Sequence, residues 1–343
     1  MTLHHVSCTV KKEAPTITVG RFCFGFFALF CLALILRNSE IAIEYISRGL
    51  LLCAKTVIPS LFPFMVLSEL LVSGGIEDAL PKWVLSPFRR LFGLSDAGCC
   101  AVLLGFLCGF PVGAKCALLA YERGRLTKEE AERTLTFSNN PSSAFLISAV
   151  GVSLWGSRRF GVALYATVLA VSVITGVVIS QLRKKDTASV AVSFESYSSA
   201  RPLTGAKLFT ESVRSATGSI LLVCAYVIFF SALMGTLNIA LASLDLPFEI
   251  STLLFCVFEI SGGVSQASAL DSPPLAAALC AFAAGWSGLS VHCQVLSVCD
   301  GKGFSFRAYF LAKLAQGLLA ACIVAFLVYL FPSLTVPAEN CVS

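Results

Sequence analysis

Residues 105–141 read GFLCGFPVGAKCALLAYERGRLTKEEAERTLTFSNNP, and this stretch decides the fold. Its apolar beginning is broken by Gly109-Phe110-Pro111-Val112-Gly113, Lys115 follows among apolar residues, and a charged amphipathic segment ends in Asn139-Asn140-Pro141. In a membrane protein, broken helices and isolated polar residues are costly, and they occur where backbone lines a cavity enclosed by protein or filled with water. The stretch therefore predicts one half of a solute-binding site.

The composition predicts a polytopic membrane protein. Of the 343 residues, 57% are hydrophobic and 13% are charged, whereas a soluble domain carries about 25% charged residues. The mean hydropathy is +0.84. The net charge of +5 is modest and gives no support to nucleic-acid binding. The basic residues lie in loops between apolar runs, as the positive-inside rule predicts.

The chain lacks the sequence motifs that mark common enzyme classes. It contains no Walker sequence, no GxGxxG after a strand, no HExxH, no GxSxG and no Cys/His metal cluster. We therefore expect no enzymatic activity, no cofactor and no metal. Most of the fifteen cysteines lie within apolar runs, and no CxxC occurs. This pattern favours cysteine as a small hydrophobe in tightly packed helices, in a compartment that is not oxidising.

The apolar segments divide the chain into two halves joined by a polar linker. A first transmembrane helix is expected between Arg21 and Arg37, followed by an amphipathic helix at the membrane surface over 38–56 and a helix over 57–73. The expected division begins with an N-terminal segment that contains the first helix (1–37) and a first repeat with its connecting helix (38–182). A cytoplasmic linker (183–205), a second repeat (206–331) and a C-terminal tail (332–343) follow.

Two apolar runs are interrupted by glycine-containing breaks. Residues 97–121 are broken at 109–113, and each half, of about ten residues, is too short to cross a hydrocarbon core of about 30 Å. A re-entrant helical hairpin fits this pattern, with a single kinked spanning helix as the alternative. Residues 275–299 are broken at Gly285-Trp286-Ser287-Gly288 and form the expected second hairpin. Uninterrupted spans are expected at 160–182, 219–238 and 305–331.

Matches in the same order suggest that the two halves are duplicated. Gly109-Phe110 pairs with Gly285-Trp286, and Asn139 pairs with Gln316. With the basic ends of both halves in the cytoplasm, the first hairpin enters from the cytoplasmic side and the second from outside. Opposite orientations are typical of secondary transporters with inverted repeats. The expected fold class is therefore all-α: a polytopic membrane protein with two inverted repeats, each containing a broken helical hairpin.

The candidate solute site lies near the membrane midplane, between the broken segments. Helix ends at the breaks supply partial charges. Lys115 is a candidate for holding an anion, with snorkelling to the interface as the alternative. Glu259 is a candidate proton or cation site, because a carboxylate inside the membrane is functional by default. For the asparagines and the histidine, helix capping and packing are the alternatives. The full candidate set is Gly109, Pro111, Gly113, Lys115, Asn139, Asn140, Glu259, Ser261, Gln266, Ser287, Gly288, His292 and Gln316.

Several runs resemble the YlbJ-like family of sporulation integral membrane proteins. In the first half these are LFPFMVLSELL (61–71), GFLCGFPVGAKCA (105–117) and ERGRLTKEEAERTLTFSNNPS (122–142). In the second half they are FEISGG (258–263) and GWSGLSVHCQVLS (285–297). The family is similar to a wider group of nucleoside-recognition or gate domains. The resemblance covers most of residues 40–330.

The resemblance implies a protein of endospore-forming bacteria that is needed for spore maturation. It also implies kinship with concentrative nucleoside transporters, whose site uses two re-entrant hairpins. The implied cargo is dipicolinate, and the implied location is the cell membrane, including the outer forespore membrane derived from the mother cell. The alternatives are a nucleoside transporter and a non-transporting protein of spore-envelope or cortex assembly. The expected partners are the solute, a coupling proton or cation, the lipid bilayer and further copies of the chain, with no nucleic acid.

Overall fold

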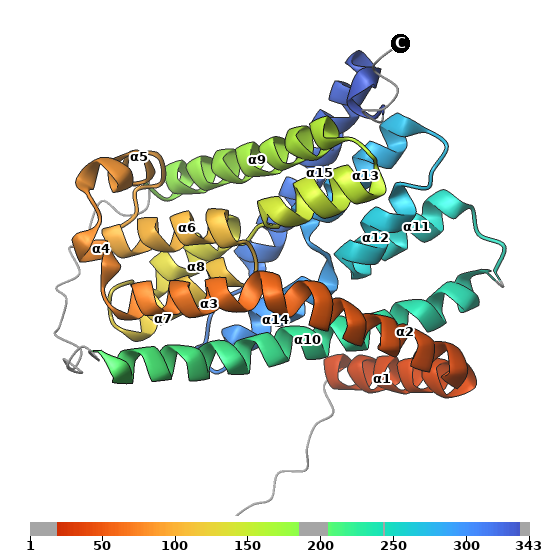
Figure 1. Ribbon diagram of the computed structural model, residues 1–343, viewed down its shortest axis with the longest axis horizontal. Coiled ribbons are helices and arrows are strands. Elements are labelled where there is room, and N and C mark those ends of the chain that lie inside the picture. Colours follow the sequence, from red (N-terminus) through yellow and green to blue (C-terminus); the bar gives the residue numbers. More distant parts are fainter. Residues whose placement is uncertain (1–18, 185–204, 243, 337–343) are drawn as a thin grey trace, which may run out of the picture.

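The computed structural model describes residues 19–184, 205–242 and 244–336, and helices are its only regular elements over these ranges (Figure 1). The predicted linker and C-terminal tail lie largely outside the described residues. Four helical segments are long and apolar enough to cross a membrane, and two sharply bent helix pairs raise the number to six. Large apolar side chains such as Phe22, Leu311 and Tyr329 are exposed on the outer surface, where lipid replaces water as the solvent. The chain is thus a multi-pass membrane protein, as predicted.

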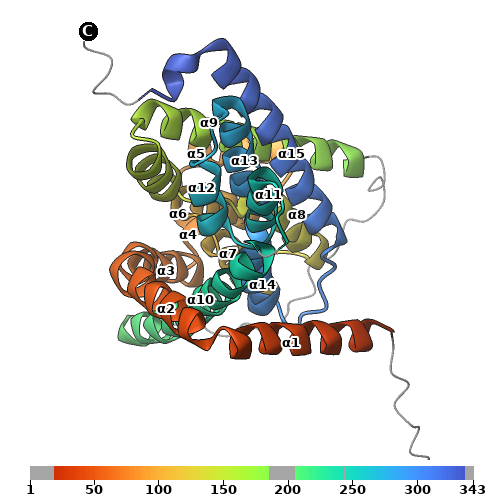
Figure 2. The same ribbon diagram turned by 90° about the vertical axis from the view of Figure 1, so that its right-hand side faces the viewer.

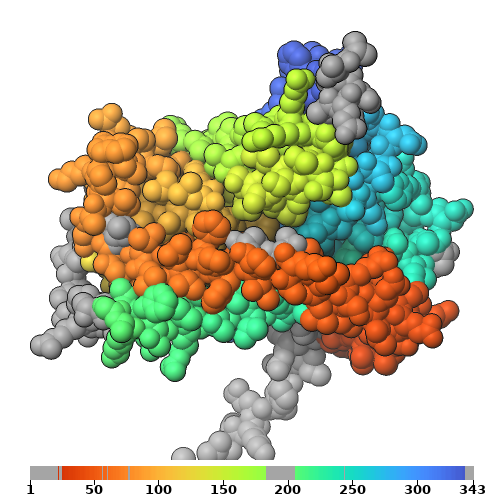
Figure 3. Space-filling view, in the orientation of Figure 1, coloured from red at the N-terminus to blue at the C-terminus, as the bar shows by residue number. Residues whose placement is uncertain are grey.

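The N-terminal helices pack along one long helix of the second half. These helices are α1 (Val19–Arg37), α2 (Ser39–Leu52), a π-helical turn η1 (Cys53–Val57) and α3 (Ile58–Ser73). The axes of α1 and α2 meet at 99°, and Figure 2 shows α1 projecting to one side of the bundle. Both α2 and α3 lie along α10 (Ala206–Ala242), as the space-filling view also shows (Figure 3).

The amphipathic helix predicted over 38–56 is present as α2 and η1 and packs on α10, while its place at the membrane surface stays a prediction. Helix α2 is amphipathic, but its small residues face α10: a Cβ atom added at Gly49 would lie 3.2 Å from Ser231 Cβ. At Gly235 of α10 an added Cβ would strike the Tyr45 ring. The predicted span 219–238 is part of the longer helix α10.

The first broken run forms a hairpin, as predicted. After α4 (Ile76–Ala79) and α5 (Lys82–Phe92), α6 (Asp96–Cys108) and α7 (Val112–Glu122) pack side by side around the 109–111 break. Helix α8 (Lys128–Ser138) packs against both. The unwound residues 139–143 lead into the π-helix η2 (Ala144–Leu154), and α9 (Arg158–Lys184) completes this half.

The second hairpin lies elsewhere than predicted. Helices α11 (Phe248–Phe258) and α12 (Ile260–Ala267) fold back on each other around Glu259. By contrast, α13 (Pro273–Trp286) and α14 (Gly288–Val298) continue as one candidate span with an interruption at Ser287. The 275–299 run is therefore a broken helix and not a hairpin. Helix α15 (Arg307–Leu330) packs along α13, and a 3-10 turn η3 (Pro332–Leu334) follows it.

The predicted matches between the halves do not hold at these positions, and the inverted orientation of the halves stays a prediction. In both halves a hairpin is followed by a helix, an unwound break, another helical segment and a long helix. In this order the 109–111 break corresponds to Glu259, and the 139–143 break corresponds to Ser287. The predicted partners of Gly109 and Asn139 were Gly285 and Gln316, which stand at other places in the order.

The two halves interlock in space. One buried core cluster joins residues of α3, α6 and α7 to residues of α10 and α14. A second joins η2 and α9 to α12, α13 and α15. Each core thus contains helices from both sides of the predicted linker, so the halves cannot be pulled apart without opening both cores.

Small residues permit the closest helix contacts in both hairpins. A Cβ atom added at Gly113 would lie 3.0 Å from the Gly105 Cα atom and would strike the Ser138 carbonyl oxygen. In the second hairpin, a Cβ atom added at Gly263 would lie 2.6 Å from the Cys256 Cα atom. The backbone positions of α6, α7 and α8 therefore depend on the absence of side chains at Gly105 and Gly113.

We predict that Gly113→Ala lowers the stability of the protein by about 1–3 kcal/mol, the usual cost of overpacking a tight core. Thermal unfolding of the purified protein in detergent measures the effect. The matched control is Gly218→Ala in α10, where an added Cβ atom meets nothing within 4 Å. That control should leave stability unchanged or raise it by up to about 1 kcal/mol, since alanine is the better helix former. Equal midpoints for the two variants would contradict the packing described above.

Candidate functional site at two broken helices

The first hairpin tip is seated on the first helix break. The backbone N–H of Phe110 donates to the Asn140 carbonyl oxygen at 2.8 Å. Gly109 has a φ of +82°, and a Cβ atom there would lie only 2.7 Å from the Ser142 nitrogen. Glycine is required here both by the positive φ and by the close approach of the chain. The tip between α6 and α7 thus helps to satisfy backbone that the break exposes.

The second hairpin tip is seated on the second break in the same way. A Cβ atom at Gly288 would lie 3.0 Å from the Ile260 nitrogen and 3.2 Å from the Glu259 Cα atom. Trp286 Nε1 donates to the Val257 carbonyl oxygen at 3.0 Å. Ser287 has a φ of +77°, which is unusual for a residue with a side chain. The two tip-on-break contacts are therefore repeated features of the molecule.

A buried lysine from α15 holds the first break. Lys313 Nζ donates to the Asn139 carbonyl oxygen at 2.9 Å, to Gln316 Oε1 at 3.1 Å and to Asn140 Oδ1 at 3.5 Å. The Lys313 side chain is fully buried, as is that of Asn139. The ammonium lies at the C-terminal end of α8, where the helix carries partial negative charge.

Gln316 and Ser172 complete this polar cluster. Gln316 Nε2 donates to the Thr136 carbonyl oxygen at 2.8 Å. Ser172 Oγ on α9 lies 2.6 Å from Asn140 Oδ1 and 3.4 Å from Gln316 Oε1. A Cβ atom at Gly285 would lie 2.8 Å from the Gln316 carbonyl oxygen. The α15 segment from Lys313 to Gln316 therefore touches both α8, at the first break, and α13, just before the second.

Polar side chains on α14 follow the second break. His292 Nδ1 lies 2.9 Å from the Tyr309 hydroxyl, and the Trp286 ring packs edge-on against the imidazole at 4.2 Å between centroids. His292 Nε2 and Gln294 Oε1 have no hydrogen-bond partner among the described residues, although both side chains are buried. Buried polar atoms without partners are costly, so each of these two atoms offers a hydrogen-bonding position.

Glu259 has a structural role that its sequence position did not reveal. Its carboxylate caps α12, accepting from Ser261 N at 2.9 Å and from Gly262 N at 2.6 Å. Ser261 therefore takes part in this cap through its backbone N–H, and Gly262 lies inside α12. Gln266 lies further along α12, and its Oε1 has no partner. The role of Glu259 as a proton or cation site stays a prediction.

Lys115 lies in a buried ion pair. Its Nζ is 2.9 Å from Glu69 Oε2, and the two side chains are only 10% and 6% exposed. The same ammonium donates to Ser215 O at 3.0 Å, to Ser215 Oγ at 2.9 Å and to Ser219 Oγ. All these hydroxyl and carbonyl partners come from α10. The lysine charge is therefore matched within the protein, and an anionic solute would have to compete with Glu69.

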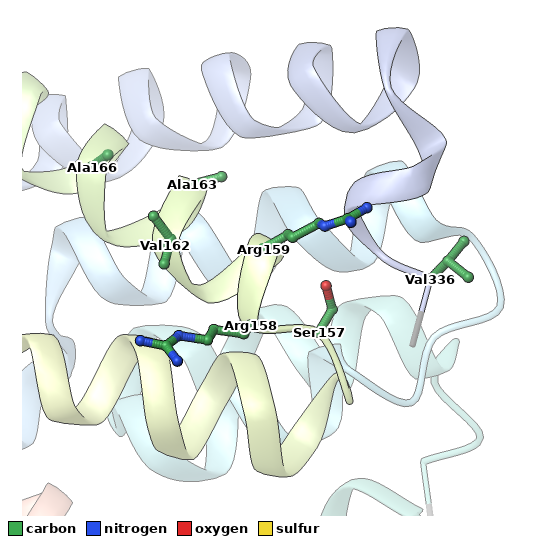
Figure 4. Close-up of a pocket in the computed structure, with 7 residues that line it drawn as sticks. All are labelled: Ser157, Arg158, Arg159, Val162, Ala163, Ala166 and Val336. Carbon is green, nitrogen blue, oxygen red and sulfur yellow. The ribbon is translucent and has the colours of Figure 1, made fainter. Parts of the chain in front are cut away.

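Two cavities can be assigned to places in the fold. One, of about 310 Å³, adjoins the ion pair and is lined by Glu69, Ser73, Arg123, Lys207, Leu208, Glu211, Ser212 and Ser215. The other, of about 590 Å³, lies at the start of α9 beside the C-terminal segment (Figure 4). There Ser157 Oγ donates to the Leu334 carbonyl oxygen at 2.6 Å. The lining of the larger cavity includes none of the predicted site residues.

The structure thus brings together part of the predicted set. Asn139, Asn140 and Gln316 meet in one cluster, which Gly109 and Gly285 approach through backbone contacts. Lys115 lies in a different place, beside α3 and α10. Sequence analysis missed Lys313, although a lysine within the apolar run 305–331 was a visible signal. It also missed Ser172, because a serine in a spanning helix carries no such signal.

The polar groups at the two breaks have the chemistry of solute-binding groups. Among the described residues no group of three or more His, Cys, Asp and Glu side chains is placed to hold a metal ion. The polar cluster offers amide oxygens, an ammonium and helix ends, which bind polar and ionic solutes.

We predict that Glu69→Gln lowers stability by about 3–5 kcal/mol, because it leaves the Lys115 ammonium buried without a counter-ion. The control is Glu122→Gln, which breaks the Lys302–Glu122 pair at 2.6 Å, where both side chains are 37% exposed. An exposed pair contributes about 0–1 kcal/mol. Thermal unfolding in detergent measures both variants. Adding Lys115→Met to Glu69→Gln should recover much of the loss, since a neutral pair removes the unpaired charge. A Glu69→Gln variant as stable as the control would show that the pair is not desolvated.

Comparison with known proteins gives one informative relative. The chain is 28% identical over 333 residues to the sporulation integral membrane protein YlbJ of Bacillus subtilis (strain 168), covering 88% of this chain and 81% of that protein. No family model and no solved structure matches the chain. The relationship to nucleoside-recognition domains therefore stays a prediction. The aligned region includes most of the described helices, and the relative is itself an integral membrane protein. This similarity supports the resemblance of the chain to the YlbJ-like sporulation integral membrane proteins.

Proposed function

We propose that the protein is a secondary transporter of a small polar or anionic solute, with dipicolinate as its cargo during endospore formation. The observation that carries the proposal is the pair of hairpin tips seated on two unwound helix breaks, Phe110 on Asn140 and Ile260 on Gly288. Unwound backbone at membrane depth is tolerated where it is buried in protein or lines a water-filled cavity. Secondary transporters commonly bind their solutes at such breaks.

The polar atoms on α14 support a solute path beside the second break. His292 Nε2 and Gln294 Oε1 are buried and unpartnered, and each supplies one hydrogen-bonding position. The two residues stand two positions apart on α14, so they point to different sides of the helix, and His292 faces Tyr309 of α15. A polar solute passing this point would satisfy groups that otherwise cost free energy.

The cavity near Lys115 supplies the charge that an anion needs. Together with the adjoining Lys115, its lining contains three cationic side chains and two carboxylates, namely Lys115, Arg123, Lys207, Glu69 and Glu211. Dipicolinate carries two carboxylates on a pyridine ring, so it can pair with these cations. The sporulation role in the name of the Bacillus subtilis relative supports this cargo over other dianions.

A nucleoside is the second candidate cargo, and the groups around His292 favour it. The Trp286 ring and the His292 imidazole offer an aromatic face and a hydrogen-bonding atom, and the Gln294 amide offers another on a different side of α14. A nucleoside base is recognised by stacking and by hydrogen bonds of this kind. The cargo therefore depends on which of the two places binds the solute. The charged cavity near Lys115 predicts a dianion, and the α14 residues predict a neutral solute.

We predict saturable uptake of radiolabelled dipicolinate by proteoliposomes containing the purified protein, with weaker uptake of nucleosides. His292→Leu combined with Gln294→Leu should lower the uptake rate at least tenfold, because it removes the polar atoms of the path and keeps the side-chain bulk. The control is Lys302→Met, which removes a cation from the surface loop between α14 and α15.

The outcomes separate the candidate functions. Nucleoside uptake without dipicolinate uptake would assign the nucleoside alternative. Correctly folded protein that moves neither solute would overturn the transport proposal and favour a non-transporting role in spore-envelope or cortex assembly. Equal rates for the α14 double variant and the control would remove these residues from the solute path.

A further inference from the structure

Lys313 stands out among the charged groups of the protein interior. Its side chain is fully buried in α15, and in the part of the chain that the structure describes no carboxylate forms an ion pair with it. Lys115, the other buried lysine, has Glu69 as its counter-ion. A buried ammonium without a carboxylate must be stabilised by neutral groups.

Every hydrogen-bond partner of the Lys313 ammonium is a neutral oxygen. The partners are the Asn139 carbonyl at 2.9 Å, Gln316 Oε1 at 3.1 Å and Asn140 Oδ1 at 3.5 Å. An ammonium has three donors, so these three oxygens use all of them. No donor is left to bind an anionic solute. The cluster therefore has the composition of a cation site.

The two amide oxygens that accept from Lys313 are oriented by other hydrogen bonds. Gln316 turns its oxygen towards Nζ because its Nε2 donates to the Thr136 carbonyl at 2.8 Å. Asn140 turns its oxygen the same way because its Nδ2 donates to the Phe137 carbonyl at 2.7 Å. Ser172 Oγ lies within hydrogen-bond distance of both amide oxygens. Contacts that do not involve Lys313 thus hold both amide oxygens towards one point.

The position of this point also suits a cation. Asn139 follows the last residue of α8, and the carbonyl groups at a helix C-terminus carry partial negative charge. Unwound carbonyls and half-helix C-terminal ends are the groups with which transporters coordinate monovalent cations. Here the ammonium of a neighbouring helix occupies that position.

We propose that the oxygens of Asn139, Asn140 and Gln316 form a monovalent-cation site at the first helix break, and that the chain fills it with its own ammonium, Lys313. The site stands on its geometry alone. Its consequence for transport rests on the proposed function: because the cation is covalently attached, solute movement needs no sodium ion at this break.

The test is to remove the tethered cation and leave the oxygens. Lys313→Ala should lower the unfolding midpoint in N-methyl-D-glucamine chloride, and sodium or lithium chloride at equal ionic strength should restore at least half of that loss with saturation. Wild-type protein should show no such dependence on the cation. Lys313→Met, which fills the space with an uncharged chain, should be equally indifferent. Lys302→Met serves as the surface control.

Further variants at Lys313 and Gln316 keep the test decisive. Lys313→Ser leaves a hydroxyl beside the oxygens and should respond to sodium as Lys313→Ala does. Adding Gln316→Leu to either variant should abolish the response, because it removes one ligand. Folded variants that ignore sodium and lithium overturn the proposal, and so does failure of both Lys313 variants to fold in every salt. Cation-dependent stability without any solute flux would support the site and count against the transport function.

If flux is found, sodium dependence tests the consequence separately. Uptake by wild-type proteoliposomes should change less than twofold when N-methyl-D-glucamine replaces sodium on both sides. A loss of uptake greater than tenfold would show that transport uses a free sodium ion bound elsewhere. It would overturn the inference that the Lys313 ammonium takes the place of sodium.

Discussion

The unwound backbone after α8 is the constraint on which much of the interior depends. Inside a bilayer no water is available to satisfy a carbonyl that a broken helix releases. The protein supplies three partners from two elements. Phe110 N comes from the first hairpin tip, and α15 supplies Lys313 Nζ and Gln316 Nε2, the latter for the Thr136 carbonyl. Since these partners come from both halves, the break holds the halves together.

The same constraint explains the distribution of glycine in the interior. Partners can reach an unwound backbone only if the neighbouring chains approach closely, and Gly109, Gly113 and Gly288 stand at such approaches. Because each of these residues has no side chain, the neighbouring backbone can come into direct contact with it. The cost is the conformational entropy of glycine in the unfolded chain. The gain is that two helix breaks can lie within the membrane domain without exposed polar groups.

The sequence predicted the elements better than their pairing. The breaks at 109–113 and 139–143 contain Gly, Pro and Asn, whose backbone preferences mark them directly. The second hairpin turns at Glu259, where neither glycine nor proline stands. The glycines at 285 and 288 interrupt a helix that then continues. Local preferences show where a helix ends, but packing against α11 and α15 decides whether the chain then turns back or runs on.

By itself the sequence determined that the chain is helical, lies in the membrane and contains broken segments with polar residues, because composition and short apolar runs depend on local chemistry alone. It also carried the likeness to the sporulation membrane proteins. Only the tertiary structure decided that Lys115 pairs with Glu69, that Glu259 caps its own helix and that Lys313 fills an oxygen cluster at the first break. A buried charge must find a partner, and the identity of that partner is fixed by which helices come together, here from 100 to 174 residues apart in the chain.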